Sequence, residues 1–261
     1  MTFYSGAFTK SPLPFTASIN DGDIEGLMNA CHGLATKKET GLDLILHTPG
    51  GSIGATEAIV HYLRQMFGCN IRVIVPQIAM SAGTMIALAS KEIILGKQSS
   101  LGPIDPQFNG IPANLIIKEF TQAQQELSQD PSRTPYWQIR LAKYPATWFY
   151  QAELAVRRAK ENVRQWLLSN MFEGRGPDAD TMVNHIVTQL SDSDANMAHD
   201  RHIHIAELLE LGICVTLMED DQELQDLILA VHHSTCLTLS NTNVYRIIEN
   251  HEGRVNVLSH G

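Results

Sequence analysis

The chain of 261 residues is predicted to form an α/β fold around a mostly parallel sheet. Three short apolar runs, at residues 42–46, 71–75 and 92–95, have the length and composition of buried strands. Segments with the apolar spacing of helices, at residues 54–67 and 81–89, lie between them. Because strand–helix–strand units of this kind join neighbouring parallel strands, the sequence predicts a parallel sheet with helices packed against it.

The rest of the chain is predicted to add helices and a C-terminal β-hairpin. An amphipathic helix is expected at residues 21–35, ahead of the first of these strands. The tail, residues 244–258, alternates apolar and polar residues, which is typical of a hairpin. We therefore expect a main domain at residues 1–217 and an extension at residues 218–261 that serves assembly or regulation. The other expected elements are helices at residues 112–127, 146–172, 178–190, 205–211 and 220–232 and a strand at 213–217.

Composition and charge exclude several classes of protein. Charged residues make up 18% and hydrophobic residues 44% of the chain, which excludes a disordered protein. The formal net charge of −9 argues against a nucleic-acid groove and against binding to an anionic membrane surface. The four cysteines form no C-x-x-C pair, so we expect reduced thiols, no zinc site and a cytoplasmic location. We expect no signal peptide and no transmembrane span, because polar residues, Gly and Pro interrupt the most apolar stretch, residues 73–89.

Two of the predicted strands end in turns of small residues that lead directly into helices. The first turn contains Gly50 and Gly51, whose backbone N–H groups are accessible because no Cβ atom blocks the approach of a ligand. The second contains Ser81, followed by Ala82 and Gly83, at the start of a helix. Both turns follow the carboxyl ends of strands, where parallel sheets bind ligands. Acyl transfer requires a nucleophilic hydroxyl and donors for the oxyanion, and the two turns together supply both.

Ser81 also has a simpler interpretation as a helix N-cap, because serine is common at that position. The Gly-Gly turn at the neighbouring strand end favours a nucleophilic role instead. The small residues after Ser81 favour it as well, since they leave room for a peptide carbonyl beside the hydroxyl. We therefore expect Ser81 to be catalytic.

Three segments, residues 44–52, 75–89 and 101–107, resemble the serine dehydrogenase proteinase family, which is related to signal peptide peptidase A. That family lies in the superfamily of the Clp protease proteolytic subunit and crotonase. A fainter likeness includes His199-Asp200 and residues 206–215. The resemblance implies a Clp/crotonase-type spiral of ββα units with helical additions, forming a serine peptidase domain.

The resemblance also assigns roles to the residues of both turns. Ser81 takes the position of the nucleophile, and Gly50, Gly51 and the backbone N–H group of Ala82 take that of the oxyanion hole. In the implied reaction Ser81 attacks a peptide carbonyl, and water then hydrolyses the acyl-enzyme. No metal or other cofactor is implied. The partners implied are a peptide or protein substrate and further copies of the chain, with the long helix at residues 146–172 as an expected contact.

The general base that activates Ser81 is the open part of this assignment. No histidine lies between Ser81 and His185, so a histidine placed as in the Clp subunit is disfavoured. Relatives of signal peptide peptidase A use a lysine, which acts as a base only where burial or a nearby cation leaves it neutral. The corresponding position favours Lys118, with Lys143 as the second candidate. Asp105, in a Pro-flanked turn, is either a supporting residue of the site or a rigid loop residue.

Two alternatives to a peptidase stay open at this point. A crotonase-type acyl-CoA enzyme would use the same oxyanion hole, but would need a basic pocket for the CoA phosphates. A catalytically silent scaffold would keep the fold in order to bind a protein partner. The tail from Ser234 onward lies outside the resemblance and leaves room for a regulatory protein partner.

The histidines are expected to have structural roles. His47 precedes the Gly-Gly turn and is expected to pack or hydrogen-bond locally. The run of His199, His202 and His204 has the residue type of metal ligands but lacks a second ligand set, so loop or helix-cap roles are expected.

Overall fold

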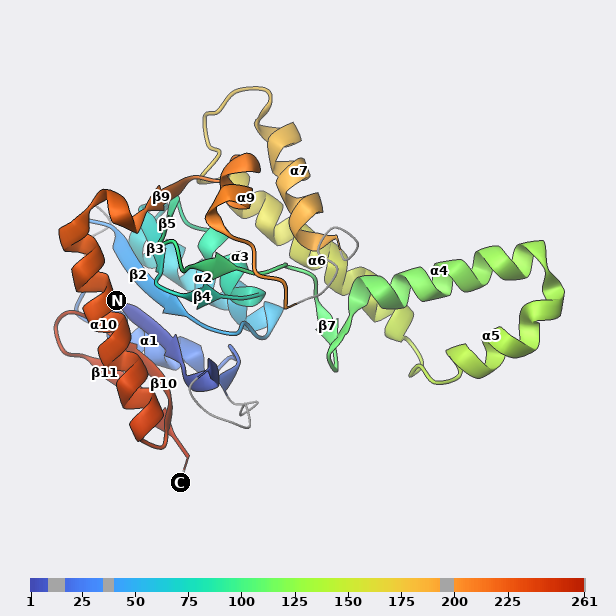
Figure 1. Cartoon of the computed structure of the whole chain (residues 1–261), viewed down its shortest axis with the longest axis horizontal. Helices are drawn as coiled ribbons and strands as arrows, with labels where there is room; N and C mark the ends of the chain where they lie inside the picture. The colour runs from blue at the N-terminus through green and yellow to red at the C-terminus, as the bar shows by residue number, and fades with distance from the viewer. Residues whose placement is uncertain (9–16, 35–39, 193–199, 261) are drawn as a thin grey trace.

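The structure, a computed structural model, describes residues 1–8, 17–34, 40–192 and 200–260. Its centre is a seven-stranded sheet in the order β11-β10-β1-β2-β3-β5-β9 (Figure 1). The strands are β1 (Thr2–Ser5), β2 (Leu42–His47), β3 (Ile71–Val75), β5 (Glu92–Leu95), β9 (Val215–Leu217), β10 (Val244–Glu249) and β11 (Val255–Ser259). The strands from β1 to β9 pair in parallel, whereas β10 pairs antiparallel with both β1 and β11. The predicted α/β fold with a mostly parallel sheet is confirmed.

Helices cover both faces of this sheet. One face carries α1 (Asp23–Cys31), α2 (Ile53–Phe67), α3 (Ala82–Leu88), α6 (Trp148–Leu168), α7 (Ala179–Ser191) and α9 (Ile205–Glu210). The other face carries α10 (Gln222–Asn241). Strand β3 shows the division, because Val73 and Val75 join the first core and Ile74 joins the core under α10. Successive side chains of a strand point to opposite faces, so both faces of the central strands are buried.

Short strands continue the main strands beyond the carboxyl end of the sheet. Thr48 pairs with Ala79 of β4 (Ile78–Ala79), and β4 pairs in parallel with β6 (Ser100–Leu101). Strand β2 therefore continues through the extended residue Thr48 and then into α2. In the same way, β3 continues through β4 and then into α3. This repeat is the expected ββα unit. It places the turn after Thr48 beside the turn after Ala79.

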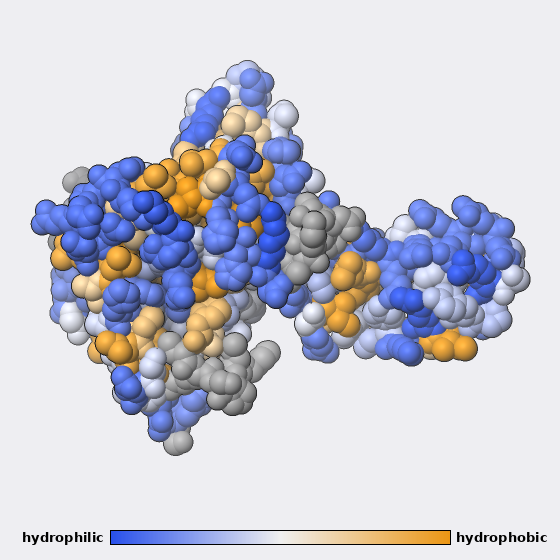
Figure 2. Space-filling view, viewed as in Figure 1, coloured by the Kyte–Doolittle hydropathy of each residue, from blue (hydrophilic) through white to orange (hydrophobic). Residues whose placement is uncertain are grey.

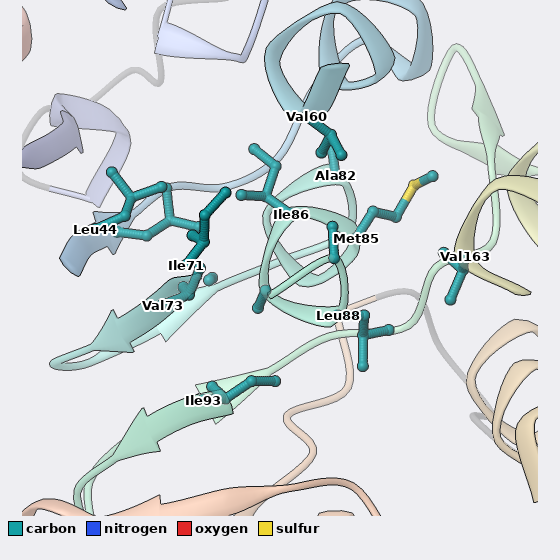
Figure 3. Close-up of a cluster of buried hydrophobic side chains, with 14 of the residues drawn as sticks. Leu44, Val60, Ile71, Val73, Ala82, Met85, Ile86, Leu88, Ile93 and Val163 are labelled. Carbon is teal, nitrogen blue, oxygen red and sulfur yellow. The ribbon is translucent and has the colours of Figure 1, made fainter. Parts of the chain in front are cut away.

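Helix α3 lies in the middle of the hydrophobic core, and all residues of Ala82–Leu88 are buried. Figure 3 shows Ile86 of this helix beside Val60 of α2, and Met85 pointing to the side of Val163 of α6. Burial of one such side chain contributes about 1.5–3 kcal/mol to folding. The helix, and with it the residue that precedes it, is therefore firmly positioned.

Helices α4 (Ala113–Gln129) and α5 (Thr134–Leu141) form an arm that projects from the body of the molecule (Figure 1). The arm begins after a small hairpin, β7 (Gln107–Phe108) and β8 (Ile111–Pro112), and returns to the body through α6. Its surface is largely hydrophilic, with apolar patches near its base and its far end (Figure 2). Ile139 on α5 is 71% exposed, so part of the apolar surface of the arm is not buried within this chain.

Most predicted helices and strands are present with small shifts at their ends. Strand β1, helix α5 and the short strands β4, β6, β7 and β8 are not predicted from the sequence, and α10 continues nine residues beyond His232, to Asn241. The helix and hairpin expected in the C-terminal extension are both present, and the hairpin joins the central sheet through β1. No helix in the described ranges is long and apolar enough to cross a membrane.

Candidate active site

The Gly-Gly turn after β2 lies directly against Ser81. Gly50 has a φ angle of 97°. A Cβ atom built on Gly50 would lie 2.6 Å from the carbonyl oxygen of Met80, 2.8 Å from the Cβ of Ser81 and 3.0 Å from the nitrogen of Ala82. Real Cβ atoms do not make contacts this short, so only glycine fits here without displacing its neighbours. The structure thus brings together the predicted nucleophile and the predicted oxyanion turn.

Backbone hydrogen bonds hold the two turns beside each other. The N–H group of Thr48 donates to the carbonyl of Ile78 (3.2 Å), and the N–H group of Met80 donates to the carbonyl of Thr48 (3.0 Å). The hydroxyl of Thr84 in α3 donates to the carbonyl of Ala79 (2.8 Å). The ends of β2 and β4 and the first turn of α3 are therefore joined on both sides of Ser81.

The backbone of Ser81 differs from that of an ordinary helix cap. Ser81 has φ 51° and ψ −113°, and its side chain makes no capping hydrogen bond. Ser52, at the start of α2, has the usual extended conformation of an N-cap, and its hydroxyl accepts a hydrogen bond from Ala55 N–H at 3.3 Å. Non-glycine residues with positive φ are uncommon and cost about 1–3 kcal/mol. The sharp turn leaves the Ser81 hydroxyl unused by the helix, which does not fit the interpretation of Ser81 as a simple cap.

Two backbone N–H groups near Ser81 are available as donors. Within the described residues, the N–H groups of Gly51 and Ala82 have no hydrogen-bond acceptor, whereas Gly83 N–H donates to the carbonyl of Met80 at 2.7 Å. These two free donors belong to the two turns that meet at Ser81. The arrangement can place an acyl oxygen between two amides while a hydroxyl attacks its carbon.

Ser81 opens into a cleft of about 940 Å³. Its apolar wall includes Met85 of α3 and Phe108 of the β7–β8 hairpin, and none of the described residues that line it is charged. Ile19, Tyr245 and Leu258 also line the cleft. Sequence reasoning missed these three residues, because they come from both ends of the chain and no local motif marks them. The cleft is at the upper end of the usual range of ligand sites, and its lining suits an uncharged segment.

The lysine candidates and Asp105 occupy different places relative to this cleft. Lys118 lies on the exposed side of α4, with its ammonium nitrogen 3.9 Å from a carboxylate oxygen of Asp192. Lys143 is exposed in the loop after α5. Neither lysine lines the cleft at Ser81 in this conformation. Asp105 is buried, and both of its chain neighbours line the cleft.

His47 is buried at the end of β2, directly before the turn. Its Nε2 lies 3.1 Å from Oε1 of Gln77, and its ring stacks on Tyr4 at a centroid distance of 5.3 Å. His232 of α10 lies 5.3 Å from the His47 ring, and its Nδ1 is 3.1 Å from the Tyr4 hydroxyl. Burial, followed by the charges of neighbouring histidines, lowers the pKa of His232 to about 4. Burial likewise lowers the pKa of His47. His47 therefore packs and hydrogen-bonds locally, behind the oxyanion turn.

The histidines of the run at residues 199–204 that the structure describes make local contacts. Nδ1 of His202 lies 2.7 Å from the Ser100 hydroxyl. His204 is the N-cap residue of α9, where its Nδ1 is 3.2 Å from the carbonyl oxygen of Ser99. His199 lies outside the described residues. In the described part of the chain, no group of three His, Cys, Asp or Glu side chains has the geometry of a metal site.

Residues 11–134 match the sequence model of the ClpP-like SDH-type serine proteinases, which confirms the family resemblance. An uncharacterised protein of Methanocaldococcus jannaschii is 30% identical over 203 residues, which cover 78% of this chain and 62% of that protein. A second uncharacterised protein of the same organism is 36% identical over 124 residues, which cover 48% of this chain and 41% of that protein. The chain thus spans less than two thirds of the length of these relatives.

Two solved structures are also similar. One is a membrane-bound stomatin-specific protease with a serine replaced by alanine, at 21% identity and a TM-score of 0.41, covering 93% of this chain and 88% of that one. The other is a membrane-bound stomatin-specific protease with a lysine replaced by alanine, in complex with a substrate peptide. It has 18% identity and a TM-score of 0.43, covering 93% of this chain and 83% of that one.

Proposed function

Because residues 11–134 match the ClpP-like SDH-type serine proteinases, we propose that this chain is a serine endopeptidase that forms an acyl-enzyme on Ser81. One observation carries the proposal: Gly50 is packed so closely on Ser81 and Ala82 that no side chain fits between them. This contact supports a site in which the nucleophile and both oxyanion donors belong to one rigid unit.

The proposed reaction is an acyl transfer to water. The Ser81 hydroxyl attacks the carbonyl carbon of a peptide bond, and its proton passes to a general base. The oxyanion accepts hydrogen bonds from the N–H groups of Gly51 and Ala82, and the amine then leaves with a proton. Water attacks the ester formed on Ser81 and releases the second product.

We propose a lysine as the general base, with Lys118 as the first candidate and Lys143 as the second. The family resemblance supports Lys118, which lies near the start of α4. In the described conformation Lys118 pairs with Asp192 outside the cleft, so its use as a base requires that α4 move toward Ser81. The β7–β8 hairpin leads directly into α4 and contributes Phe108 to the cleft. A substrate that binds against Phe108 therefore contacts the segment that leads into α4. Asp105 is proposed as a supporting residue next to the cleft wall.

The charge of the cleft favours a peptidase over the acyl-CoA alternative. CoA carries several phosphate charges, which are usually bound by Lys or Arg side chains. No lysine or arginine is present among the described residues that line the cleft. An uncharged peptide segment fits this lining better than a polyanionic cofactor.

Assembly and location are proposed from separate observations. We propose a homo-oligomer, supported by the family resemblance and by the exposed apolar residues of the arm, among them Tyr136 and Ile139. The C-terminal extension leaves room for a regulatory protein partner. A cytoplasmic location is proposed from the four free, separated cysteines.

The proposal is tested by labelling with a fluorophosphonate probe, read by intact mass and peptide mapping. The expected result is one label on Ser81 in the wild type, none in Ser81→Ala, and strongly slowed labelling in Lys118→Ala. Ser52→Ala is the matched control, because Ser52 also lines the cleft and caps a helix, and it should label like the wild type. Loss of labelling in Lys143→Ala, with normal labelling in Lys118→Ala, would make Lys143 the general base in place of Lys118. A folded wild-type chain that takes no label would favour the silent scaffold.

A further inference from the structure

A fully buried ion pair links the C-terminal hairpin to the start of α1. Nε of Arg246 in β10 lies 2.8 Å from Oδ1 of Asp23, the first residue of α1, and both side chains are 0% exposed. The guanidinium also lies over the ring of Phe3, 5.0 Å from its centroid. Burial of both charges is costly, so such a pair is weak evidence for added stability.

Each partner of this pair also holds the backbone of residues 18–20. Nη2 of Arg246 donates a hydrogen bond to the carbonyl of Ser18 at 2.8 Å. Oδ2 of Asp23 accepts a hydrogen bond from the N–H group of Asn20 at 2.9 Å. The ion pair therefore fixes this three-residue segment at both of its ends.

The segment in turn fixes the Gly-Gly turn. Between its two anchored ends, Ile19 N–H donates to the carbonyl of Gly50 at 2.7 Å, and its carbonyl accepts from Ser52 N–H at 2.9 Å. The packing is tight, because a Cβ atom at Gly51 would collide with the backbone nitrogen and oxygen of Ile19. Gly51 thus lies between two hydrogen bonds to one residue, while its own N–H group has no acceptor among the described residues.

We propose that Arg246 and Asp23 are a positioning pair for the oxyanion turn. The pair holds residues 18–20, these hold Gly50 and Gly51 from behind, and the turn presents Gly51 N–H beside Ser81. The catalytic consequence rests on the proposed peptidase function. The C-terminal hairpin is then a part of the active site, since the same hairpin also supplies Tyr245 and Leu258 to the cleft wall.

The test separates positioning from stability. Asp23→Leu/Arg246→Met replaces the ion pair by apolar side chains, which often preserves or raises stability, but removes both hydrogen bonds to residues 18–20. Hydrogen exchange of the Ile19 and Ser52 amides in this full-length variant should be at least about tenfold faster than in the wild type, with the amides of β3 unchanged. The rate of fluorophosphonate labelling at Ser81 should fall by about 10–100-fold, because one oxyanion donor is misplaced.

Two further variants keep the test decisive. Ile247→Ala is the matched control, because Ile247 is the next residue of β10 and is buried on the opposite face, against Tyr4 and Leu239. It should lose stability without a change in exchange at Ile19 or in labelling. Arg246→Lys keeps a cation for Asp23 but lacks the fork that also reaches Ser18, so it should change exchange and labelling in the same direction as the double variant.

The two proposals fail in different ways. If exchange at Ile19 and Ser52 is unchanged in both the double variant and Arg246→Lys, the positioning role is overturned, whatever the activity. If exchange accelerates but labelling keeps the wild-type rate, the pair holds the turn without serving the reaction, and the proposal is overturned in its catalytic part. A wild type that is not labelled at all refutes the peptidase, while the exchange data still decide what the ion pair holds.

Discussion

Replacement of Gly50 by alanine should disable the site, because the added methyl group would collide with the backbone and side chain of the Ser81 turn. The new methyl group would lie 2.6 Å from the Met80 carbonyl oxygen and 2.8 Å from the Cβ of Ser81. Both atoms belong to the unit that presents the nucleophile. The turn must therefore move away from Ser81, or the Ser81 turn must unfold locally.

The magnitude has two parts. A non-glycine residue at a φ of 97° costs about 1–3 kcal/mol in backbone strain. The steric conflict with Met80 and Ser81 adds about 1–3 kcal/mol, as in other overpacked sites. Displacement of an oxyanion donor lowers the rate by about 10²–10³-fold.

Gly68→Ala separates these contributions. Gly68 follows α2 with a φ of 64°, and a Cβ atom added to it would meet no other atom within 4 Å. It should therefore show only the strain of about 1–3 kcal/mol, with no change in activity.

The assay is thermal unfolding combined with the rate of fluorophosphonate labelling at Ser81. We expect Gly50→Ala to unfold at a lower temperature than Gly68→Ala. At a temperature where both variants are folded, Gly50→Ala should be labelled at least about 100-fold more slowly. Equal labelling rates for the two variants would refute the claim that the Gly50 contact defines the site.

Two further predictions concern stability. Ser81→Gly should abolish labelling. It should also raise the free energy of unfolding by about 1 kcal/mol, because glycine relieves the backbone strain at φ 51°. A melting temperature lower than that of Ser81→Ala would contradict this. The stability of the wild type should fall by up to about 3 kcal/mol as the pH decreases from about 6.5 to about 4, since the unfolded chain binds a proton in this range that buried His232 does not. His232→Gln should make this dependence shallower in denaturant titrations. An unchanged slope in this variant would count against the assignment.

The motif-bearing part of the site could be predicted from sequence because its signals are local. Gly50 and Gly51 follow an apolar strand, and Ser81 stands between another strand and a helix, so their positions follow from periodicity and topology. The remainder of the cleft could not be predicted in this way. Three residues reach the site only through the tertiary fold, and no local sequence pattern predicts their position there: Ile19, Tyr245 and Leu258.

The missed elements have similar physical reasons. Strand β1 has four residues, all buried, so it lacks the alternation that marks a half-exposed strand. Helix α5 has a proline in its first turn. In a sequence a proline usually indicates the end of a helix, although the first turn tolerates it. Helix α10 continues through a run of Ser, Thr and Cys after His232, where propensity is weak and packing of Thr235 and Leu239 against the body decides the outcome.

The pairing of β10 with β1 has a consequence for the timing of activity during synthesis. Thr2 pairs with Glu249, and Ser5 with Arg246, so β1 can complete its pairing only when the distant strand β10 has been synthesised. Contacts of such large sequence separation form late in folding. A nascent chain that ends before residue 246 already carries Ser81 and both glycines, yet lacks the side chain that anchors the segment behind them. The site proposed at Ser81 would thus be complete only after β10 has paired with β1.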